Sequence, residues 1–391
     1  MKIGIDARSV CMLQRGMPVY AWNLLIRLPQ QLPACEFYFF INTQFEHNLP
    51  KEEYQAKLEL LCTHNNVNII DIKDDAYMYW EQWLLYKACK TYQIDLLHMP
   101  ANRICLLYAN KQIVTLHDTI EWDNLSLGDV LKVDKNIKHI LYAMRTYLYT
   151  LVQYTVGVRL VKKIVTISKY AQSMIFNTLS INPCDLNYIY HGIPDAFRKV
   201  ECIPLEQRRG VLMLGGASPH KNPYNTLKSY AQLPSTVKEQ NPLSIIGIAP
   251  QSLSQFDAWI SELSIKEYVS LQSWVDETEL VKAFQYSKVF LFASKEEGFG
   301  FPQIQAMSTG TPVLISTCPV LMEISEGLMP CAEWNDTQGL SIHLSEMLTN
   351  KSHLQALSKL ALELSTKFTW EHSVSQVVDI YQEVLEPNVS S

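Results

Sequence analysis

Long apolar runs are missing from this sequence of 391 residues. No stretch approaches the roughly eighteen consecutive apolar residues that a membrane-spanning helix needs. The first ten residues also lack the pattern of a secretory signal peptide. We therefore expect a cytoplasmic protein.

Metal-binding and redox patterns are missing too. The nine cysteines are scattered and odd in number, without a C-x-x-C pair or a Cys/His ligand spacing. This usage favours a reducing compartment and no structural zinc. No D-x-D motif is present, so the sequence does not require bound Mg²⁺ or Mn²⁺.

An excess of positive charge is absent. Charged residues make up 18% of the chain and the formal net charge is -6, which disfavours a general nucleic-acid-binding protein. The first apolar run is not followed by G-x-G-x-x-G and a suitably spaced acid, which disfavours an NAD-dependent oxidoreductase. With 48% hydrophobic residues, the chain is long enough to bury the cores of two or three domains.

The stretch from Tyr286 to Ser316 has the clearest organisation. Residues 289–293 and 312–315 are apolar runs typical of buried strands. A short helix is predicted from Pro302 to about Gly310, because proline suits the first helical position and glycine a left-handed C-cap. Residues 296–300 therefore form a loop at a helix N-terminus.

This loop has the chemistry of a phosphate-binding site. Free amides at a helix N-terminus attract anions, and Gly298 and Gly300 allow close approach to the backbone. Glu297 would repel a bare phosphate, so we expect it to accept hydrogen bonds from neutral hydroxyls beside the phosphate. A sugar attached to a diphosphate meets both demands. Glycines at such turns are common in any α/β protein, and a solvated Glu297 is the simpler alternative if the motif is taken alone.

The string EGFGFPQIQAMSTGTPV, residues 297–313, resembles the EGFGLP(x)2EAMACGTPV signature of family 4 glycosyltransferases. The resemblance implies a GT-B fold, an α/β architecture of two Rossmann-like doubly wound domains facing a central cleft, and usually retention of anomeric configuration. Two glutamates eight positions apart hold the donor sugar and the ribose in that family. The first corresponds to Glu297, whereas the second position is Gln305.

The N-terminal half also begins like a doubly wound domain. The strand KIGIDARS is followed by a loop through Arg15 and Gly16 and a helix over 20–28. RGMPVYAWNLL resembles the family's RGIGRYxxNLL, in which Gly16 matches, but Pro18 replaces the second glycine and supplies no N–H. Further strands are predicted at 37–41, 67–70, 96–98 and 113–116, with a helix over 80–92.

The dyad His117-Asp118 follows one of these predicted strands. Carboxyl ends of parallel strands are where open α/β sheets bind ligands. HMPAN, residues 98–102, and IVTLHDTI, residues 113–120, resemble the family's HSPN and VVTLHDL segments. The resemblance places His117 against donor-sugar hydroxyls, although a lone histidine at a strand end is more often structural.

The second half opens with VLMLGG and ASPHKNP, residues 211–223. These resemble the family's YVGRxxPRKN segment, in which an arginine and a lysine neutralise the donor diphosphate. Lys221 matches the lysine, Gly216 stands in place of the arginine, and His220 replaces the arginine before the lysine. The resemblance thus implies catalytic roles for Glu297, Lys221 and His117. It implies donor contacts for Gly16, Asp118, Gly215, Gly216, His220, Gly298, Phe299, Gly300, Phe301, Pro302 and Gln305.

Domain boundaries are predicted from composition. Residues 198–209 are polar and irregular, which indicates a linker. We expect an acceptor-side domain over 1–198, a nucleotide-sugar-binding domain over 199–367, and a C-terminal helix over 368–391 that crosses back. Val374, Val377, Val378 and Tyr381 in that helix are predicted core residues.

Residues 132–163 differ from the rest in charge. Seven Lys/Arg accompany one acid, so the segment carries +6 and the remainder -12. Apolar residues at helical spacing predict an amphipathic helix with a basic face. One interpretation is an ordinary domain helix whose basic face is solvated. The other is contact with an anionic membrane, peripheral to its inner face.

The leading hypothesis is a metal-independent retaining glycosyltransferase. It would move a sugar from a nucleotide-diphosphate donor to a glycan or lipid-linked acceptor, in surface polysaccharide or glycolipid synthesis, without a cofactor. Pro18, Gly216 and Gln305 depart from the family's donor site. They leave open an alternative, a catalytically weakened glycosyltransferase-like subunit that binds a partner or a sugar nucleotide.

Overall fold

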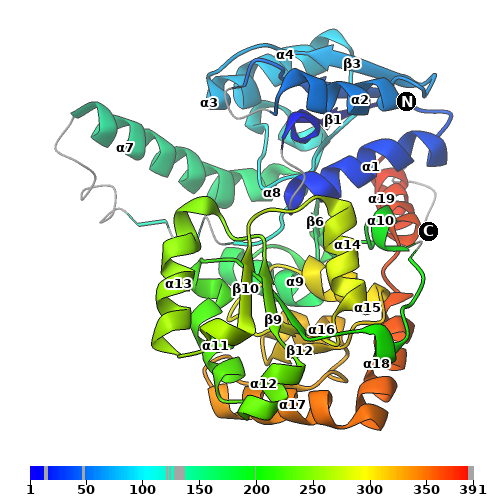
Figure 1. Cartoon of the computed structure of the whole chain (residues 1–391). Helices are drawn as coiled ribbons and strands as arrows, with labels where there is room; N and C mark the ends of the chain where they lie inside the picture. Colours follow the sequence, from blue (N-terminus) through cyan, green and yellow to red (C-terminus); the bar gives the residue numbers. More distant parts are fainter. Residues whose placement is uncertain are drawn as a thin grey trace. The chain divides into compact units, whose positions relative to one another are not determined.

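The computed structural model divides into two compact units, which are described separately. It describes residues 1–12, 16–45, 49–119, 122, 125–126, 137–198 and 200–385. The first unit comprises residues 1–190 together with 371–391, and the second comprises 191–370. Each unit is built on one parallel sheet (Figure 1).

The first unit contains a seven-stranded parallel sheet of order β3-β2-β1-β4-β5-β6-β7. Its strands are β1 (Lys2–Asp6), β2 (Glu36–Ile41), β3 (Val67–Asp71), β4 (Leu96–Met99), β5 (Gln112–Thr115), β6 (Lys163–Thr166) and β7 (Leu186–Tyr188). The main helices are α1 (Met17–Gln31), α2 (Lys51–Leu61), α4 (Leu85–Thr91), α7 (Ile137–Val152), α9 (Lys169–Leu179) and α19 (Trp370–Leu385). Two π-helical segments, η2 (Trp80–Leu84) and η4 (Gln153–Gly157), connect α3 (Tyr77–Tyr79) with α4 and α7 with α8 (Val158–Leu160).

The second unit contains a six-stranded parallel sheet of order β10-β9-β8-β11-β12-β13. Its strands are β8 (Val211–Leu214), β9 (Leu243–Ile246), β10 (Val269–Gln272), β11 (Val289–Phe292), β12 (Val313–Ser316) and β13 (Cys331–Ala332). The helices are α10 (Asp195–Arg198), α11 (Pro223–Ala231), α12 (Ser235–Gln240), α13 (Leu253–Glu262), α14 (Glu277–Tyr286), α15 (Phe301–Ser308), α16 (Pro319–Ile324), α17 (Thr337–Thr349) and α18 (Lys351–Ser365).

Burial explains why short apolar runs become strands here. Parallel strands are covered on both faces and therefore need no alternation of polar and apolar residues. β11 and β12 are buried at every position, as are β4 and β5 in the first unit. The predicted strands over 289–293, 312–315, 96–98 and 113–116 are thus confirmed, with ends that differ by one or two residues.

Each sheet has a point where strand order reverses. In the first unit it lies between β1 and β4, and in the second between β8 and β11. Loops that follow the two strands at such a point leave in opposite directions and open a crevice at their carboxyl ends. The loops that carry Lys221 and Glu297 follow β8 and β11, so the topology places them at the reversal.

The N-terminal part of the first unit ends at residue 190, which is earlier than the predicted domain boundary at 198. Residues 191–198 belong to the second unit, where Phe197 lies against Phe284 and the amide of Ile193 donates to Phe368 O. The polar segment 198–209 also lies inside this unit rather than between units, because buried Arg208 bonds Thr311 Oγ1 and Thr309 O. The polar composition of residues 198–209 indicated a linker, but it did not reveal that Arg208 is buried and fixed to Thr309 and Thr311.

The C-terminal helix α19 joins the first unit from Glu371 onward. Val374, Val377, Val378 and Tyr381 are buried, which confirms them as core residues. Tyr381 does more than fill space, because its hydroxyl shares a 2.6 Å hydrogen bond with Nδ1 of buried His98 on β4. The other ring nitrogen, Nε2, lies 2.9 Å from Thr115 Oγ1 on β5. This polar chain ties the tail to the centre of the sheet.

Helix α7 lies within segment 132–163, for which the sequence left two interpretations open. Residues Lys132 and Lys135 of that segment lie outside the described residues. In α7, the side chains of Ile137, Leu141 and Leu148 are 70%, 64% and 51% exposed. Part of the apolar side of α7 is therefore exposed, and Lys138 and Arg145 are exposed as well, as expected of a solvated basic face. None of the helices in the described part of the chain is long and apolar enough to cross a membrane.

Replacement of Tyr381 by phenylalanine tests the polar chain. Tyr381→Phe keeps the buried ring but leaves a nitrogen of His98 without its partner, so the free energy of unfolding should fall by about 1–3 kcal/mol. Urea unfolding near neutral pH measures the change. Tyr286 is 49% exposed, and Tyr286→Phe serves as the matched control, with an expected change within about 0.5 kcal/mol. Equal stabilities of the two variants would contradict the assignment.

Candidate functional site

Lys221 and Glu297 meet at the strand-order reversal of the second unit. The ammonium nitrogen of Lys221 lies 2.8 Å from both carboxylate oxygens of Glu297. The side chain of Glu297 is only 7% exposed, whereas that of Lys221 is 35% exposed. A nearly buried carboxylate requires a charged or hydrogen-bonding partner, and Lys221 supplies it. The sequence predicted both residues for one site, and the structure brings them into direct contact.

Backbone contacts hold the two loops together. The carbonyl of His220 accepts hydrogen bonds from the amides of Lys295 and Glu296, at 2.8 and 3.3 Å. Its imidazole is exposed. The side-chain amide of buried Asn222 donates from Nδ2 to Ala293 O and Trp334 O. Asn222 adopts a left-handed conformation with φ of 56° just before Pro223, the first residue of α11. Sequence reasoning missed the role of Asn222, although asparagine before proline favours such a turn.

Gly215 and Gly216 provide room for this arrangement. A Cβ atom on Gly215 would lie 2.3 Å from Cγ1 of Ile248, so only glycine fits there. A Cβ atom on Gly216 would lie 3.0 Å from Cγ of Lys221. The resembled family carries arginine at the position of Gly216. Here the aliphatic part of the Lys221 side chain packs against Gly216, where the side chain of an arginine would begin.

The N-terminus of α15 lies directly after Glu297. Gly300 is its N-cap, with φ of 96°, and a Cβ atom there would come 2.9 Å from Leu321 Cδ2. Pro302 occupies the first turn as predicted. Among the described residues, no carbonyl accepts a hydrogen bond from the amides of Gly298 or Gly300. The helix therefore presents donors suited to an anion.

The aromatic residues of this loop serve packing. The Phe299 ring is buried against His191 and Phe368, so only its backbone remains for a ligand. The half-buried ring of Phe301 stacks on His191 with centroids 4.7 Å apart. Gln305 lies on α15 and is half-buried.

His117 and Asp118 follow β5 in the first unit. The amide of His117 donates to Asn102 Oδ1 at 2.7 Å, and Asn102 Nδ2 donates to Asp118 Oδ1 at 3.4 Å. Pro100 O lies 3.0 Å from Nε2 of His117. Because a carbonyl only accepts, that nitrogen carries the proton when the ring is neutral. Burial lowers the pKa of His117 to about 4, so the ring is neutral at physiological pH. Such a ring orients hydroxyls but does not act as an acid.

The loop before α1 is described only in part. Arg15 lies outside the described residues. Gly16 is the exposed N-cap of α1 with φ of 57°. Pro18 lies in the first turn of that helix, where a missing N–H removes no helical hydrogen bond.

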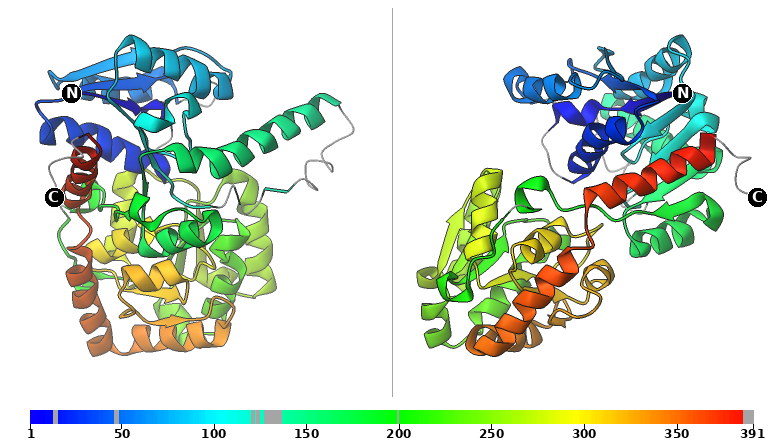
Figure 2. Two further views of the ribbon diagram at one scale, coloured as in Figure 1. Left: turned by 180° about the vertical axis from the view of Figure 1, so that it is seen from behind. Right: turned by 90° about the vertical axis from the view of Figure 1, so that its right-hand side faces the viewer.

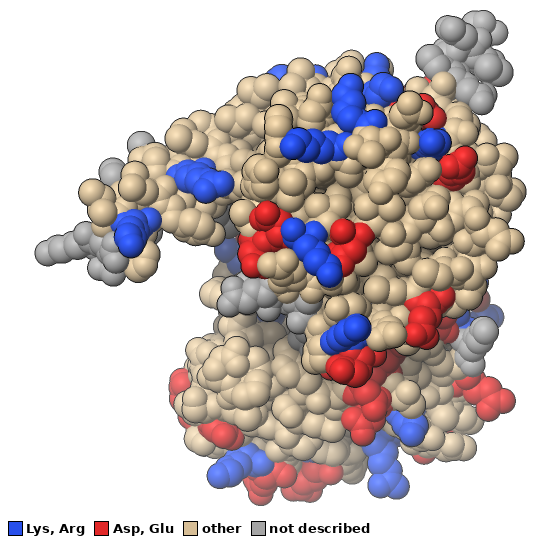
Figure 3. Space-filling model, turned by 90° about the horizontal axis from the view of Figure 1, so that it is seen from above, with Lys and Arg blue, Asp and Glu red and all other residues tan. Residues whose placement is uncertain are grey.

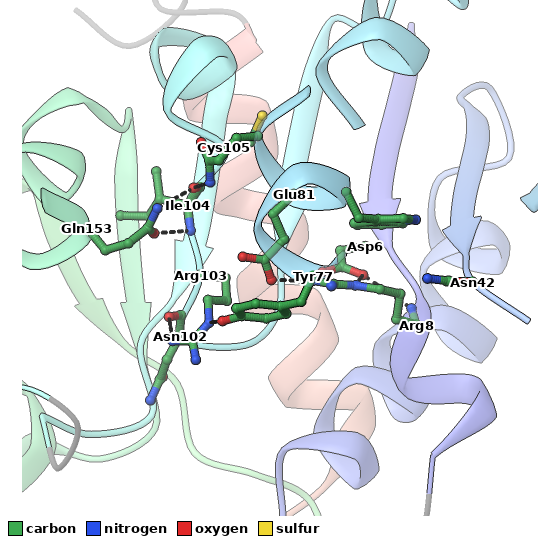
Figure 4. A network of polar contacts seen from close by, with 12 residues as sticks. Asp6, Arg8, Asn42, Tyr77, Glu81, Asn102, Arg103, Ile104, Cys105 and Gln153 are labelled. Carbon is green, nitrogen blue, oxygen red and sulfur yellow. Dashed lines mark hydrogen bonds and ion pairs between the residues drawn. The ribbon is translucent and has the colours of Figure 1, made fainter. Parts of the chain in front are cut away.

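A buried polar network of the first unit was missed by sequence reasoning (Figure 4). The guanidinium of Arg8 lies 2.7 Å from both Asp6 Oδ2 and Glu81 Oε1, and stacks 4.1 Å from the Trp80 ring. Tyr149 of α7 donates to Glu81 Oε2. Burial raises the pKa of Glu81, while Arg8 opposes that shift. Only a pattern linking IDAR with a glutamate on a later helix could have indicated this network.

The guanidinium of Arg208 does not compensate for the family arginine that is missing at Gly216. Arg208 is fully committed to carbonyl, hydroxyl and thiol partners within its own unit and is not a phosphate ligand. The described residues contain no cluster of three or more His, Cys, Asp or Glu side chains suited to a metal ion.

Sequence and fold comparisons identify the second unit. Residues 198–363 match the family described as Glycosyl transferases group 1. The second unit contains a glycosyltransferase group 1 domain. O-antigen chain mannosyltransferase B of Escherichia coli is 24% identical over 236 residues, covering 56% of this chain and 60% of that protein. O-antigen chain mannosyltransferase RfbU of Salmonella typhimurium is 24% identical over 226 residues, covering 57% and 61%. The alignments thus span about three fifths of these relatives.

Solved structures establish the fold of the whole chain. Anabaena HepE in complex with UDP and glucose aligns with a TM-score of 0.68 at 16% identity, covering 98% of this chain and 100% of that chain. Together with the two parallel-sheet units, this confirms the predicted GT-B fold.

The pKa values of the buried histidines predict a pH effect on stability. Burial lowers the pKa of His117 to about 4 and that of His98 to about 3, against an ordinary 6.5. As the pH falls below about 6.5, the unfolded chain binds protons that the folded chain does not, so stability decreases towards pH 4 and is unaffected above 7.

The comparison of His117→Gln with the parent protein isolates one histidine. From about pH 7 to about pH 5, the variant should lose about 2 kcal/mol less unfolding free energy than the parent, as measured by urea unfolding. His372 is exposed, and His372→Gln should follow the parent. Identical pH slopes for all three proteins would refute the buried, neutral assignment of His117.

Proposed function

We propose that this chain is a retaining family 4 glycosyltransferase that needs no metal. It moves a hexose from a nucleotide-diphosphate sugar to a glycan or lipid-linked acceptor during synthesis of a surface polysaccharide or glycolipid. One observation carries the proposal: Lys221 and Glu297 are paired at the strand-order reversal, close in sequence to the amides of Gly298 and Gly300 before α15, inside the glycosyltransferase group 1 domain. This arrangement offers a cation and amides to phosphates and a carboxylate to hydroxyls.

The proposed chemistry follows from where charge develops. When the bond between the anomeric carbon and the diphosphate oxygen breaks, negative charge grows on the leaving diphosphate. Lys221 and the amides of Phe299 and Gly300 would stabilise it without reorganisation. The acceptor oxygen then bonds to the same face of the anomeric carbon, and the departing phosphate takes its proton. Glu297 orients the sugar, and neutral His117 would hold its hydroxyls.

The donor sugar is proposed from the relatives. Two O-antigen mannosyltransferases favour an activated mannose, and HepE was solved with UDP and glucose. We propose that the protein acts in the cytoplasm, with no cofactor besides the donor. A panel of GDP-, UDP- and dTDP-sugars tests the donor. Neither turnover nor thermal stabilisation with any of them would favour the alternative of a glycosyltransferase-like subunit.

Replacement of Lys221 should abolish most transfer. Lys221→Ala removes one preorganised donor to the leaving diphosphate, so kcat should fall by about 10²- to 10³-fold. Glu297→Gln should raise KM and lower kcat, because a neutral amide holds sugar hydroxyls less strongly. Release of nucleoside diphosphate from the best donor of the panel measures both.

Lys295 provides a matched control, since it lies in the loop of Glu297, where its amide donates to His220 O, and its side chain is 47% exposed. Lys295→Ala should retain activity within about threefold. Because Lys221→Ala leaves Glu297 without its cation, thermal unfolding must show that each variant is folded. A folded Lys221→Ala variant with parental kcat would refute the proposed role.

Restoring the family carboxylate at position 305 should strengthen donor binding. Gln305→Glu replaces neutral hydrogen bonds to the ribose by charge-assisted ones, worth about 1–2 kcal/mol or about tenfold in Kd. Isothermal titration calorimetry with the donor measures the change in Kd. Gln303 on the same helix is buried and donates to Leu321 O, so Gln303→Glu is the control and should not strengthen donor binding. Unchanged or weaker binding would place Gln305 away from the ribose.

A further inference from the structure

Helix α7 and its continuation through η4 and α8 carry an uncovered apolar stripe. Ile137, Leu141, Leu148 and Val152 recur at spacings of four and seven residues, which places them on one side of the helix. Their exposed fractions are 70%, 64%, 51% and 37%. The stripe continues with Val156 and Leu160, exposed by 48% and 49%. This concentration of exposed apolar side chains marks an interaction surface rather than scattered surface residues.

The base of this helix is fixed to the first unit. Tyr149 hydrogen-bonds with Glu81 and Gln82. Glu81 is itself held by Arg8, as Figure 4 shows. Buried Gln153 accepts from the amide of Ile104 at 2.7 Å and donates to its carbonyl at 2.9 Å. From this anchored base, α7 extends away from the body of the first unit (Figures 1 and 2). The stripe is therefore displayed on a held support.

The charges of the same stretch have one sign. Residues 137–163 contain no Asp or Glu and five Lys/Arg: Lys138, Arg145, Arg159, Lys162 and Lys163. Lys138, Arg145 and Lys162 are exposed, and no carboxylate among the described residues pairs with Arg145 or Lys162. On the projecting helix, Figure 3 shows basic side chains and no acidic ones. The surface thus combines apolar and cationic groups.

We propose that the stripe on residues 137–160 docks on the surface of an anionic lipid bilayer. The apolar side chains would enter the boundary between headgroups and acyl chains, while Lys138 and Arg145 lie against lipid phosphates. The contact surface is thus the apolar side of the helix as well as its cations. A second copy of the chain is less suitable, because two acid-free cationic helices repel each other.

Vesicle co-sedimentation of the full chain tests the proposal without any sugar donor, so its outcome is independent of transferase activity. The parent should bind phosphatidylcholine vesicles that contain phosphatidylglycerol at least about tenfold more tightly than phosphatidylcholine alone. Leu141→Ser combined with Leu148→Ser should weaken that binding at least about tenfold. Lys138→Glu combined with Arg145→Glu should also weaken it about tenfold or more.

Two control proteins match these changes elsewhere. Ile342 is 59% exposed on α17, and Ile342→Ser should bind vesicles like the parent. Lys351→Glu combined with Lys359→Glu reverses two exposed charges on α18 and should have less than a threefold effect, because these lysines do not belong to the proposed contact surface. Circular dichroism confirms that each variant is folded.

Three results would overturn the proposal. Absence of binding to anionic vesicles would do so, and so would equal binding to neutral and anionic vesicles. The third is concentration-dependent dimerisation that Leu141→Ser with Leu148→Ser abolishes while no vesicles are bound, since the stripe would then be an interface between copies.

Discussion

The second unit is organised around one nearly buried carboxylate. A carboxylate as little exposed as that of Glu297 requires a compensating partner, and Lys221 supplies the opposite charge from a neighbouring loop. The two loops meet because β8 and β11 are adjacent strands at the point where the strand order reverses. The backbone carbonyl of His220 and the side-chain amide of Asn222 then fix the loops to each other. Sheet topology and one ion pair together determine the site.

This pairing also constrains what kind of ligand is suitable. A ligand that attracts Lys221 alone would leave Glu297 with a weakened partner in a poorly solvated place. A ligand that offers an anion and hydroxyl groups side by side satisfies both residues at once. A sugar bonded to a diphosphate has that arrangement, whereas a free phosphate or a free sugar has half of it. The physical argument for a nucleotide-sugar donor thus rests on the pair rather than on either residue.

The sequence predicted the fold and the partners of this site for identifiable reasons. Buried parallel strands such as β11 and β12 are short apolar runs, and proline and glycine delimit α15 on both sides. Glu297 and Lys221 each follow a predicted strand, so their location at the carboxyl ends of the strands could be predicted from the sequence. The contacts of Asn222, Arg208 and Glu81 were not, because each depends on a backbone or side-chain partner far away in sequence. Residues 198–209 were interpreted as a linker because their composition is polar and the distant partners of Arg208 could not be read from the sequence.

The amphipathic pattern of residues 137–152 exposes a more general limit of sequence reasoning. Helical periodicity tells which side chains share a face, but it does not tell what covers that face. In α19 the apolar side is buried against the sheet of the first unit, and Tyr381 reaches His98. In α7 an equally periodic apolar side is left uncovered, while the polar contacts of Tyr149 and Gln153 hold the helix base. Burying Leu141 and Leu148 against some surface would relieve the unfavourable exposure of apolar area, and the one-signed charge around them selects an anionic surface.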